Sequence, residues 1–273
     1  RGMVGERRVG RPIVPREHGA WAVLYGAFLA GIGVAGRVTL PAALLLGAVT
    51  FLAFANGPLT LILRSAGNRA PSTERQRAIF WFAAYAAGGL ACAAPLLAFY
   101  RMAFLVPFAM AAACFLVLRA FLVREGDDRS LSGALIGTAG LTLVGPAAHA
   151  VAMNGAQPTG ALLWLLLWLY FAGGVFYVRT RIRLVVARRK GATSVARRAR
   201  WSCLAYHALL LVLIPALAAA AVVPWAVLLA FAPALGRAAA GVRRQDTMLN
   251  VRRLGWSEVG LTAAFVLILV VSL

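Results

Sequence analysis

The sequence PREHGAWA, residues 15–22, stands where a basic N-terminal segment meets the first long apolar run. Residues 1–16 carry five arginines, whereas residues 17–36 are mostly small or apolar. Glu17 and His18 fall in the first turn of the helix that this run predicts. Unpaired backbone N–H groups and the helix dipole favour an anion there and disfavour an imidazolium. The junction therefore predicts both the start of a membrane span and a candidate site.

Apolar residues dominate the rest of the chain. Of its 273 residues, 62% are hydrophobic and only 13% are charged, and the mean hydropathy is +0.82. A soluble globule needs a more charged surface than this composition supplies. We expect an all-α integral membrane protein with a basic segment at 1–16 and a single transmembrane helical domain at 17–273. Runs of about 20 apolar residues predict about nine transmembrane helices.

The basic residues are distributed unevenly between the two sides of the predicted membrane. The net charge of +20 would suggest nucleic acid binding in a soluble protein. Here, however, 26 of the 28 basic residues fall in alternate segments, and only Arg37 and Arg101 lie in the others. This asymmetry follows the positive-inside rule and predicts a cytoplasmic N-terminus. We expect membrane lipids as partners and no nucleic acid, and the sequence does not identify a protein partner.

The composition also indicates the cell type. A single lysine accompanies 27 arginines in a chain rich in Ala, Gly and Val, which is typical of GC-rich bacterial genomes. We therefore expect a multi-pass protein of a bacterial cytoplasmic membrane. The expected spans are 17–36, 40–63, 78–99, 102–123, 131–153, 161–183, 202–222, 224–236 and 255–273. The sixth is expected to continue without a turn through residue 199 as an arginine-rich helix against anionic headgroups.

The first span carries a face of small residues at helical spacing. Gly19, Ala22, Gly26, Ala30 and Gly33 recur every three or four positions. Small residues let two helix backbones approach closely in lipid. We therefore expect this helix to be central in the bundle.

Three titratable residues are candidates for proton transfer. A neutral imidazole at His18 can accept or relay a proton beside Glu17. The alternative is a simple helix start, with Glu17 complementing the dipole and His18 at headgroup level. His207 lies about one turn inside the seventh predicted span, where an ionisable group usually faces the bundle interior. Glu17, His18 and His207 are therefore the expected catalytic residues.

Polar residues near the same side of the membrane are candidates for ligand binding. Asn56 precedes Gly57-Pro58, where the proline frees a backbone carbonyl that protein must satisfy or a cavity must use. Tyr177 and Arg181 share one helical face and Arg179 lies on another. These arginines either snorkel to the interface or clamp a phosphate or carboxylate. The expected ligand-binding residues are Trp21, Asn56, Tyr177, Arg179, Arg181 and Tyr206.

The remaining metal-ligating residue types do not form a recognisable site. Asp127 and Asp128 precede Ser130 and an apolar run, a pattern typical of a helix cap. Adjacent acids also bind metals, but no second acidic pair faces these two, and the sequence leaves their role open. Neither a disulfide framework nor metal spacing is present among Cys92, Cys114 and Cys203. We expect no metal and no cofactor.

Three segments together resemble the YwiC-like family of bacterial membrane proteins. They are PREHGAWA at 15–22, VFYVRTRIR at 175–183 and AYH at 205–207. The resemblance extends over nearly the whole chain. It implies a bacterial membrane protein and no particular activity.

The expected architecture is also distantly similar to that of the UbiA superfamily of intramembrane prenyltransferases. Those enzymes have nine helices, an inner N-terminus and a cytoplasm-facing cavity, and aspartate motifs at the inner ends of helices two and six hold diphosphate through magnesium. The corresponding stretches here are NGPLT at 56–60 and YVRTR at 177–181, which lack every expected aspartate. The resemblance therefore implies a UbiA-like bundle in which arginine replaces the magnesium clamp.

These observations favour a cytoplasm-facing cavity that binds an anionic amphipathic lipid, isoprenoid or quinone-like ligand. In a magnesium-independent enzyme, arginines would hold the charged head while His18 or His207 transfers a proton. The alternative is a small transporter or an accessory subunit that assembles a respiratory complex. The sequence does not separate catalysis from binding. The cavity is expected near Glu17, His18, Asn56, Tyr177, Arg181 and His207.

Overall fold

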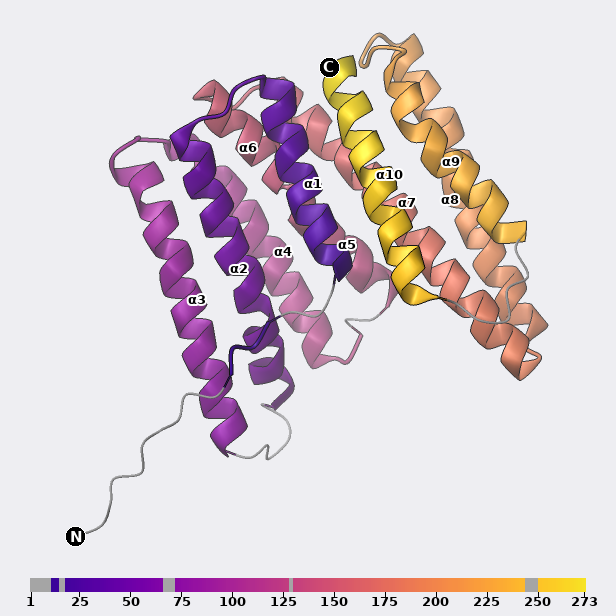
Figure 1. Ribbon diagram of the computed structural model, residues 1–273, viewed down its shortest axis with the longest axis horizontal. Helices are drawn as coiled ribbons and strands as arrows, with labels where there is room; N and C mark the ends of the chain where they lie inside the picture. The colour runs from indigo at the N-terminus through magenta and orange to yellow at the C-terminus, as the bar shows by residue number, and fades with distance from the viewer. Residues whose placement is uncertain (1–10, 15–17, 66–71, 128–129, 244–249) are drawn as a thin grey trace.

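The computed structural model describes residues 11–14, 18–65, 72–127, 130–243 and 250–273. All regular structure within these ranges is helical, and the helices lie side by side in one bundle (Figure 1). The predicted all-α fold is confirmed. The elements are α1 (His18–Ala35), α2 (Leu40–Ser65), α3 (Ser72–Ala98), the short 3-10 helix η1 (Ala103–Leu105), α4 (Val106–Arg124), α5 (Leu131–Thr142), α6 (Val144–Met153), α7 (Pro158–Lys190), α8 (Thr193–Ala219), α9 (Val227–Arg243) and α10 (Val251–Ser272).

The surface of the bundle is strongly apolar. Seven helical segments in the described part of the chain are long and apolar enough to cross a membrane. Large apolar side chains on them point outward, among them Leu90, Val117 and Leu211, which are 69%, 68% and 62% exposed. Such a surface is stable against acyl chains and costly in water. The chain is a multi-pass membrane protein, and the count of about nine crossings stays a prediction.

Helix α1 lies in the middle of the bundle, as its small residues predicted, and contacts α5, α6, α7 and α10. A Cβ atom at Gly26 would lie 2.8 Å from Cγ2 of Thr262 on α10. A Cβ at Gly31 would collide with the carbonyl oxygen of Gly145 on α6. Close packing therefore involves two faces of α1, whereas a Cβ at Gly19 would meet nothing within 4 Å.

Two apolar cores meet at α1. One joins α1 to α7, α8, α9 and α10, around fully buried side chains such as Phe231 and Phe265. The other joins α1 to α2, η1 and α6, around Leu24 and Val151. Figure 1 shows α2, α3 and α4 on one side of α1 and α8, α9 and α10 on the other. The central helix therefore separates two groups of polar residues described below.

The arginine-rich continuation of the sixth predicted span is not one helix. Gly191 adopts a left-handed conformation with φ of 66°, and the Ala192 N–H donates to the Ala187 carbonyl at 2.8 Å. These are the marks of a helix C-cap. Helix α7 therefore ends at Lys190, and α8 runs back alongside it from Thr193. The prediction of an unbroken helix to residue 199 is wrong, because this glycine was not recognised as a stop.

Two further predicted boundaries differ from the structure. The fifth predicted span divides into α5 and α6 at Leu143. The basic loop expected at 237–253 is partly helical, because α9 continues to Arg243 and α10 begins at Val251. Arg237 thereby moves from a predicted loop into a helix that packs in the bundle. This shift places Arg237 in the half-buried ion pair described in the next section.

Candidate functional site

The PREHGAWA junction lies only partly within the described residues. Glu17 falls outside them, and so does the side chain of His18, whose backbone begins α1. Trp21 is stacked on Tyr25 with ring centroids 5.7 Å apart, and its ring lies 4.9 Å from that of Phe54 on α2. Phe54 in turn stacks on Tyr85 of α3. Trp21 therefore belongs to an aromatic cluster on the α2 and α3 side of the bundle.

Asn56 lies on the same side. Helix α2 runs unbroken through Pro58, and the Thr60 hydroxyl donates to the Asn56 carbonyl at 2.8 Å. The Asn56 side chain lines a narrow cleft between α2 and α4 that Arg119 also lines. The buried Nε of Arg119 has no hydrogen-bond partner among the described residues. Helix α2 therefore continues through the proline, and Asn56 lies beside Arg119 of α4 in this cleft.

The predicted residues of α7 and α8 form a second group across α1. The Arg181 guanidinium donates from Nη1 to the Gly241 carbonyl of α9 at 3.2 Å. The Tyr177 ring packs directly on Gly241, where a Cβ would lie 2.9 Å from the tyrosine oxygen. The Tyr206 hydroxyl donates to the Leu169 carbonyl at 2.8 Å. These side chains join α7 to α8 and α9 through polar contacts.

Arg179 points to a different neighbour, as the helical spacing predicted. Its Nη1 donates to the Ser130 carbonyl at 2.9 Å, at the start of α5. The Ser130 hydroxyl accepts from the Gly133 N–H at 3.0 Å and caps that helix. Asp127 is exposed in the preceding turn, and Asp128 lies outside the described residues. Arg179 therefore holds α7 to α5 rather than facing Tyr177 and Arg181.

The predicted site residues thus occupy two regions of the bundle. Trp21 and Asn56 lie on the α2 side of α1, whereas Tyr177, Arg181, Tyr206 and His207 lie among α7, α8 and α9. A single cavity near Glu17, His18, Asn56, Tyr177, Arg181 and His207 stays a prediction.

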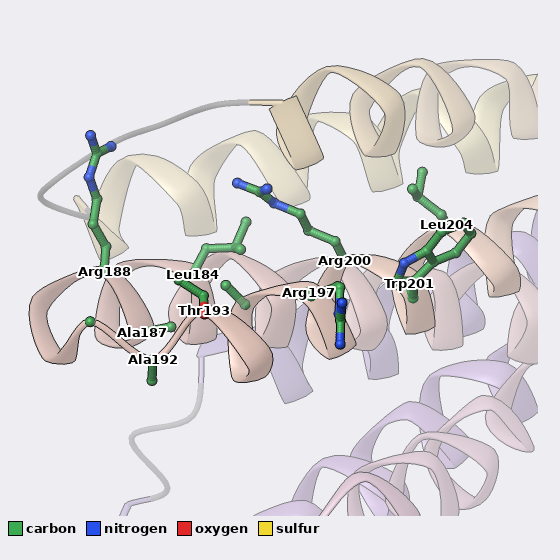
Figure 2. Close-up of a pocket in the computed structure, with 11 residues that line it drawn as sticks. Leu184, Ala187, Arg188, Ala192, Thr193, Arg197, Arg200, Trp201 and Leu204 are labelled. Carbon is green, nitrogen blue, oxygen red and sulfur yellow. The ribbon is translucent and has the colours of Figure 1, made fainter.

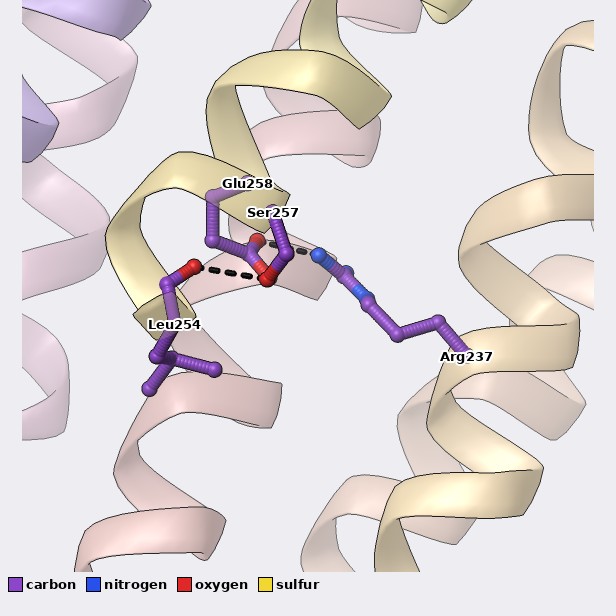
Figure 3. Close-up of polar contacts among 4 residues, drawn as sticks. All are labelled: Arg237, Leu254, Ser257 and Glu258. Atoms are coloured by element: carbon purple, nitrogen blue, oxygen red, sulfur yellow. Dashed lines mark hydrogen bonds and ion pairs between the residues drawn. The ribbon is translucent and has the colours of Figure 1, made fainter. Parts of the chain in front are cut away.

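Sequence reasoning missed a half-buried ion pair between α9 and α10. Figure 3 shows the Arg237 side chain of α9 reaching across to Glu258 of α10. The two side chains are only 10% and 22% exposed. The Arg237 guanidinium also lies over the Tyr177 ring, 4.4 Å from its centroid. The sequence did contain a signal for this pair. Glu258 is the last acidic residue of the chain and precedes an apolar run, and an ionisable residue in a membrane span usually has a partner.

Three polar atoms around this pair are buried without a partner among the described residues: Arg237 Nε, Glu258 Oε1 and His207 Nε2. The other histidine nitrogen, Nδ1, lies 2.8 Å from the carbonyl oxygen of Cys203, one helical turn earlier. Unsatisfied polar atoms are costly in an apolar surrounding. The cluster therefore offers unused hydrogen-bonding capacity at a buried position.

A separate groove of about 780 Å³ lies along the hairpin formed by α7 and α8. Figure 2 shows Arg188 of α7 and Arg200 of α8 extending to the same side of this hairpin. Trp201 is 66% exposed beside them. Among the described residues that line the groove, none is acidic. Its principal lining side chains are Leu184, Arg188, Arg197, Arg200, Trp201 and Leu204.

The length of α7 indicates where the groove lies relative to the membrane. Its 33 residues extend about 50 Å at a rise of 1.5 Å per residue, whereas the hydrocarbon core of a bilayer is about 30 Å thick. The arginine-rich end of α7 therefore emerges at headgroup level. Guanidinium groups beside leucine and tryptophan at this level can hold a charged head and an apolar chain together.

Comparison with known proteins gives a family and no closer relative. No curated protein and no solved structure matches the chain. The UbiA-like arrangement of helices therefore stays a prediction. The family model described as YwiC-like protein matches residues 14–149, a range that begins at the PREHGAWA junction and ends in α6. Through this match, the chain belongs to the YwiC-like family.

Proposed function

We propose that the protein binds an anionic amphipathic lipid in the groove of the α7–α8 hairpin, on the cytoplasmic side of a bacterial membrane. The observation that carries the proposal is the arginine-lined groove itself, with its apolar wall. Its side follows from the charge distribution, because the hairpin belongs to the strongly basic segments that the positive-inside rule assigns to the cytoplasm.

The chemistry of the lining residues supports a phosphate-bearing headgroup. Arginine binds phosphate oxygens through two parallel N–H groups, and Arg188 and Arg200 present such groups from facing helices. Leu184 and Leu204 supply apolar surface for the adjoining chain. Trp201 is the type of side chain that concentrates at the membrane–water interface. The groove thus suits a ligand with a charged head and a hydrophobic tail.

The arginine side chains that line the groove favour direct contact between a phosphate head and guanidinium groups. A magnesium clamp needs carboxylate oxygens, and none of the described lining residues supplies one. A phosphate or diphosphate head in this groove would be held by guanidinium groups alone. Direct contact with arginine agrees with the absence of aspartate from residues 56–60 and 177–181. The groove itself lies nearer the tip of the α7–α8 hairpin than these two segments do.

The test compares two double variants in nanodiscs that contain phosphatidylglycerol or only phosphatidylcholine. Arg188→Gln with Arg200→Gln should weaken retention of phosphatidylglycerol, measured by native mass spectrometry, by roughly 100-fold, because each variant residue loses a charge-assisted hydrogen bond to phosphate worth about 1.5 kcal/mol. The matched control is Arg189→Gln with Arg198→Gln, which removes the same charge from exposed positions outside the groove. An equal loss in both double variants would show that only surface charge attracts the lipid and would refute the proposal.

A further inference from the structure

The polar cluster of α7, α8, α9 and α10 is a second site, separate from the groove. Its residues are Tyr177, His207, Arg237 and Glu258, one from each helix. An ionisable residue within a membrane span is expensive to keep unless it has a function or a partner. Glu258 and Arg237 are partners, yet each retains a buried atom that no described residue contacts. The ion pair by itself therefore does not satisfy the cluster.

The unpartnered atoms of Glu258 and His207 are both acceptors. His207 Nδ1 lies 2.8 Å from the Cys203 carbonyl, which can only accept, so Nδ1 carries the hydrogen and Nε2 keeps a lone pair. Glu258 uses Oε2 for Arg237 and keeps the lone pairs of Oε1. Two buried acceptors without a donor need a hydrogen-bond donor such as water or a transferable proton. They do not fit an anion.

Two glycines of α7 lie beside His207 and the Glu258 carboxylate. A Cβ at Gly173 would lie 3.4 Å from His207 Nε2, and a Cβ at Gly174 would lie 3.6 Å from Glu258 Oε2. These consecutive glycines therefore let His207 of α8 and Glu258 of α10 lie close to the α7 backbone. Alanine at either position would add a methyl group at ordinary contact distance from these side chains, so the space beside the glycines can be reduced experimentally.

We propose that Glu258 and His207 form an intramembrane proton-binding site that water reaches along Gly173 and Gly174. A proton passes from water to Glu258 Oε1 or His207 Nε2 and returns to water, with no electron transferred. Ionised Glu258 is held by Arg237. Protonation removes the carboxylate charge and leaves the Arg237 guanidinium with the face of Tyr177. Proton binding therefore changes the contact between α9 and α10.

Several side chains around the proposed site also titrate or carry charge. Tyr170, Tyr177 and Arg181 face it from α7, Cys203 faces it from α8 and Arg237 from α9. Tyr170 is stacked on Phe265 of α10, with ring centroids 3.7 Å apart, and closes the apolar side of the cluster. Because these groups also titrate or carry charge, the test must assign its signal to Glu258.

The test is an infrared difference titration of the full chain in nanodiscs between about pH 4 and pH 10, a range that includes the ordinary pKa values of glutamate, histidine and cysteine. Wild-type protein should show a protonated-carboxyl band that appears and disappears with pH and shifts in D₂O. Glu258→Gln should lose this band. A band that survives Glu258→Gln, or no carboxyl titration over this range, would overturn the proposal.

A second pair of variants separates proton access from a purely structural ion pair. Gly174→Ala should slow deuterium exchange of the Glu258 carboxyl by about tenfold or more, because exchange of a buried group requires access of water. Gly260→Ala on α10 is the matched control, since its added methyl group would meet nothing within 4 Å. Unchanged exchange in Gly174→Ala would exclude the proposed water path. Neither variant touches the α7–α8 groove, so the result is independent of lipid binding.

Discussion

At the scale of single residues, one glycine decides how closely α7 and α9 approach. Gly241 is buried beneath the Tyr177 ring, and its carbonyl accepts a hydrogen bond from Arg181. Any side chain there would displace the tyrosine whose face lies under Arg237. The polar cluster therefore depends on a residue that has no polar side chain of its own.

This dependence gives a stability prediction. Gly241→Ala should lower the free energy of unfolding by about 1–3 kcal/mol, because the added methyl group overpacks the contact with Tyr177. Gly236→Ala in the same helix is the control, since its Cβ would meet nothing within 4 Å and alanine favours a helix by about 0.5–1 kcal/mol. Thermal unfolding in detergent measures both variants. Equal behaviour of the two would contradict the packing argument.

The Arg237–Glu258 pair gives a second prediction at this scale. Arg237→Met alone should destabilise the protein by about 3–5 kcal/mol, because it leaves Glu258 buried without its counter-charge. Adding Glu258→Leu should restore much of that loss, since an apolar pair of similar size removes both charges together. The same unfolding measurement detects this recovery. Additive losses in the double variant would mean that the two side chains do not interact.

At the scale of elements, the α7–α8 hairpin is organised by its turn. Gly191 has a positive φ that lets the chain reverse after Lys190. The reversal places the arginines of α7 opposite those of α8, and the groove lies between them. A continuous helix would instead have spread these charges along the membrane surface.

Gly191→Ala tests the importance of this turn. A left-handed conformation costs an L-residue roughly 1–2 kcal/mol, so the hairpin should loosen and phosphatidylglycerol retention should fall. Gly255→Ala, at an exposed position in α10 where a Cβ would meet nothing within 4 Å, should leave retention unchanged. Native mass spectrometry of both variants provides the comparison. Retention equal to that of the wild type in Gly191→Ala would show that the turn does not organise the groove.

At the scale of the whole molecule, the helices carry the basic segments to one end of the bundle. The α7–α8 turn and the α3–η1 turn lie at opposite ends (Figure 1). The positive-inside rule then predicts that Thr193 faces the cytoplasm and that Phe99 faces the opposite side. The orientation of the protein is therefore open to direct measurement.

The measurement uses single cysteines in a chain whose Cys92, Cys114 and Cys203 are replaced by alanine. A membrane-impermeant maleimide added to intact cells should label Phe99→Cys and leave Thr193→Cys unlabelled. Both positions are exposed, so accessibility depends on which side of the membrane they occupy. Labelling of Thr193→Cys with protection of Phe99→Cys would reverse the proposed orientation and place the groove outside.

The sequence by itself determined that this is an all-helical, multi-pass membrane protein, and it identified the central role of α1. These properties follow from hydropathy, charge order and small-residue spacing, which are local along the chain. Local patterns also separated the Tyr177 and Arg181 face of α7 from that of Arg179. They did not reveal the turn at Gly191, because one glycine in a helical run is compatible with continuation.

Only the tertiary structure decided which polar residues meet. Arg237 and Glu258 are 21 positions apart on different helices, and His207 approaches α7 at Gly173 from a third. Their proximity depends on how α7, α8, α9 and α10 pack, and no local periodicity encodes that arrangement. Helix packing also explains why Trp21 and Asn56 are apart from Tyr177, although the sequence grouped the three residues. The Trp21 ring and Asn56 lie on the α2 side of α1, and Tyr177 lies on the opposite side.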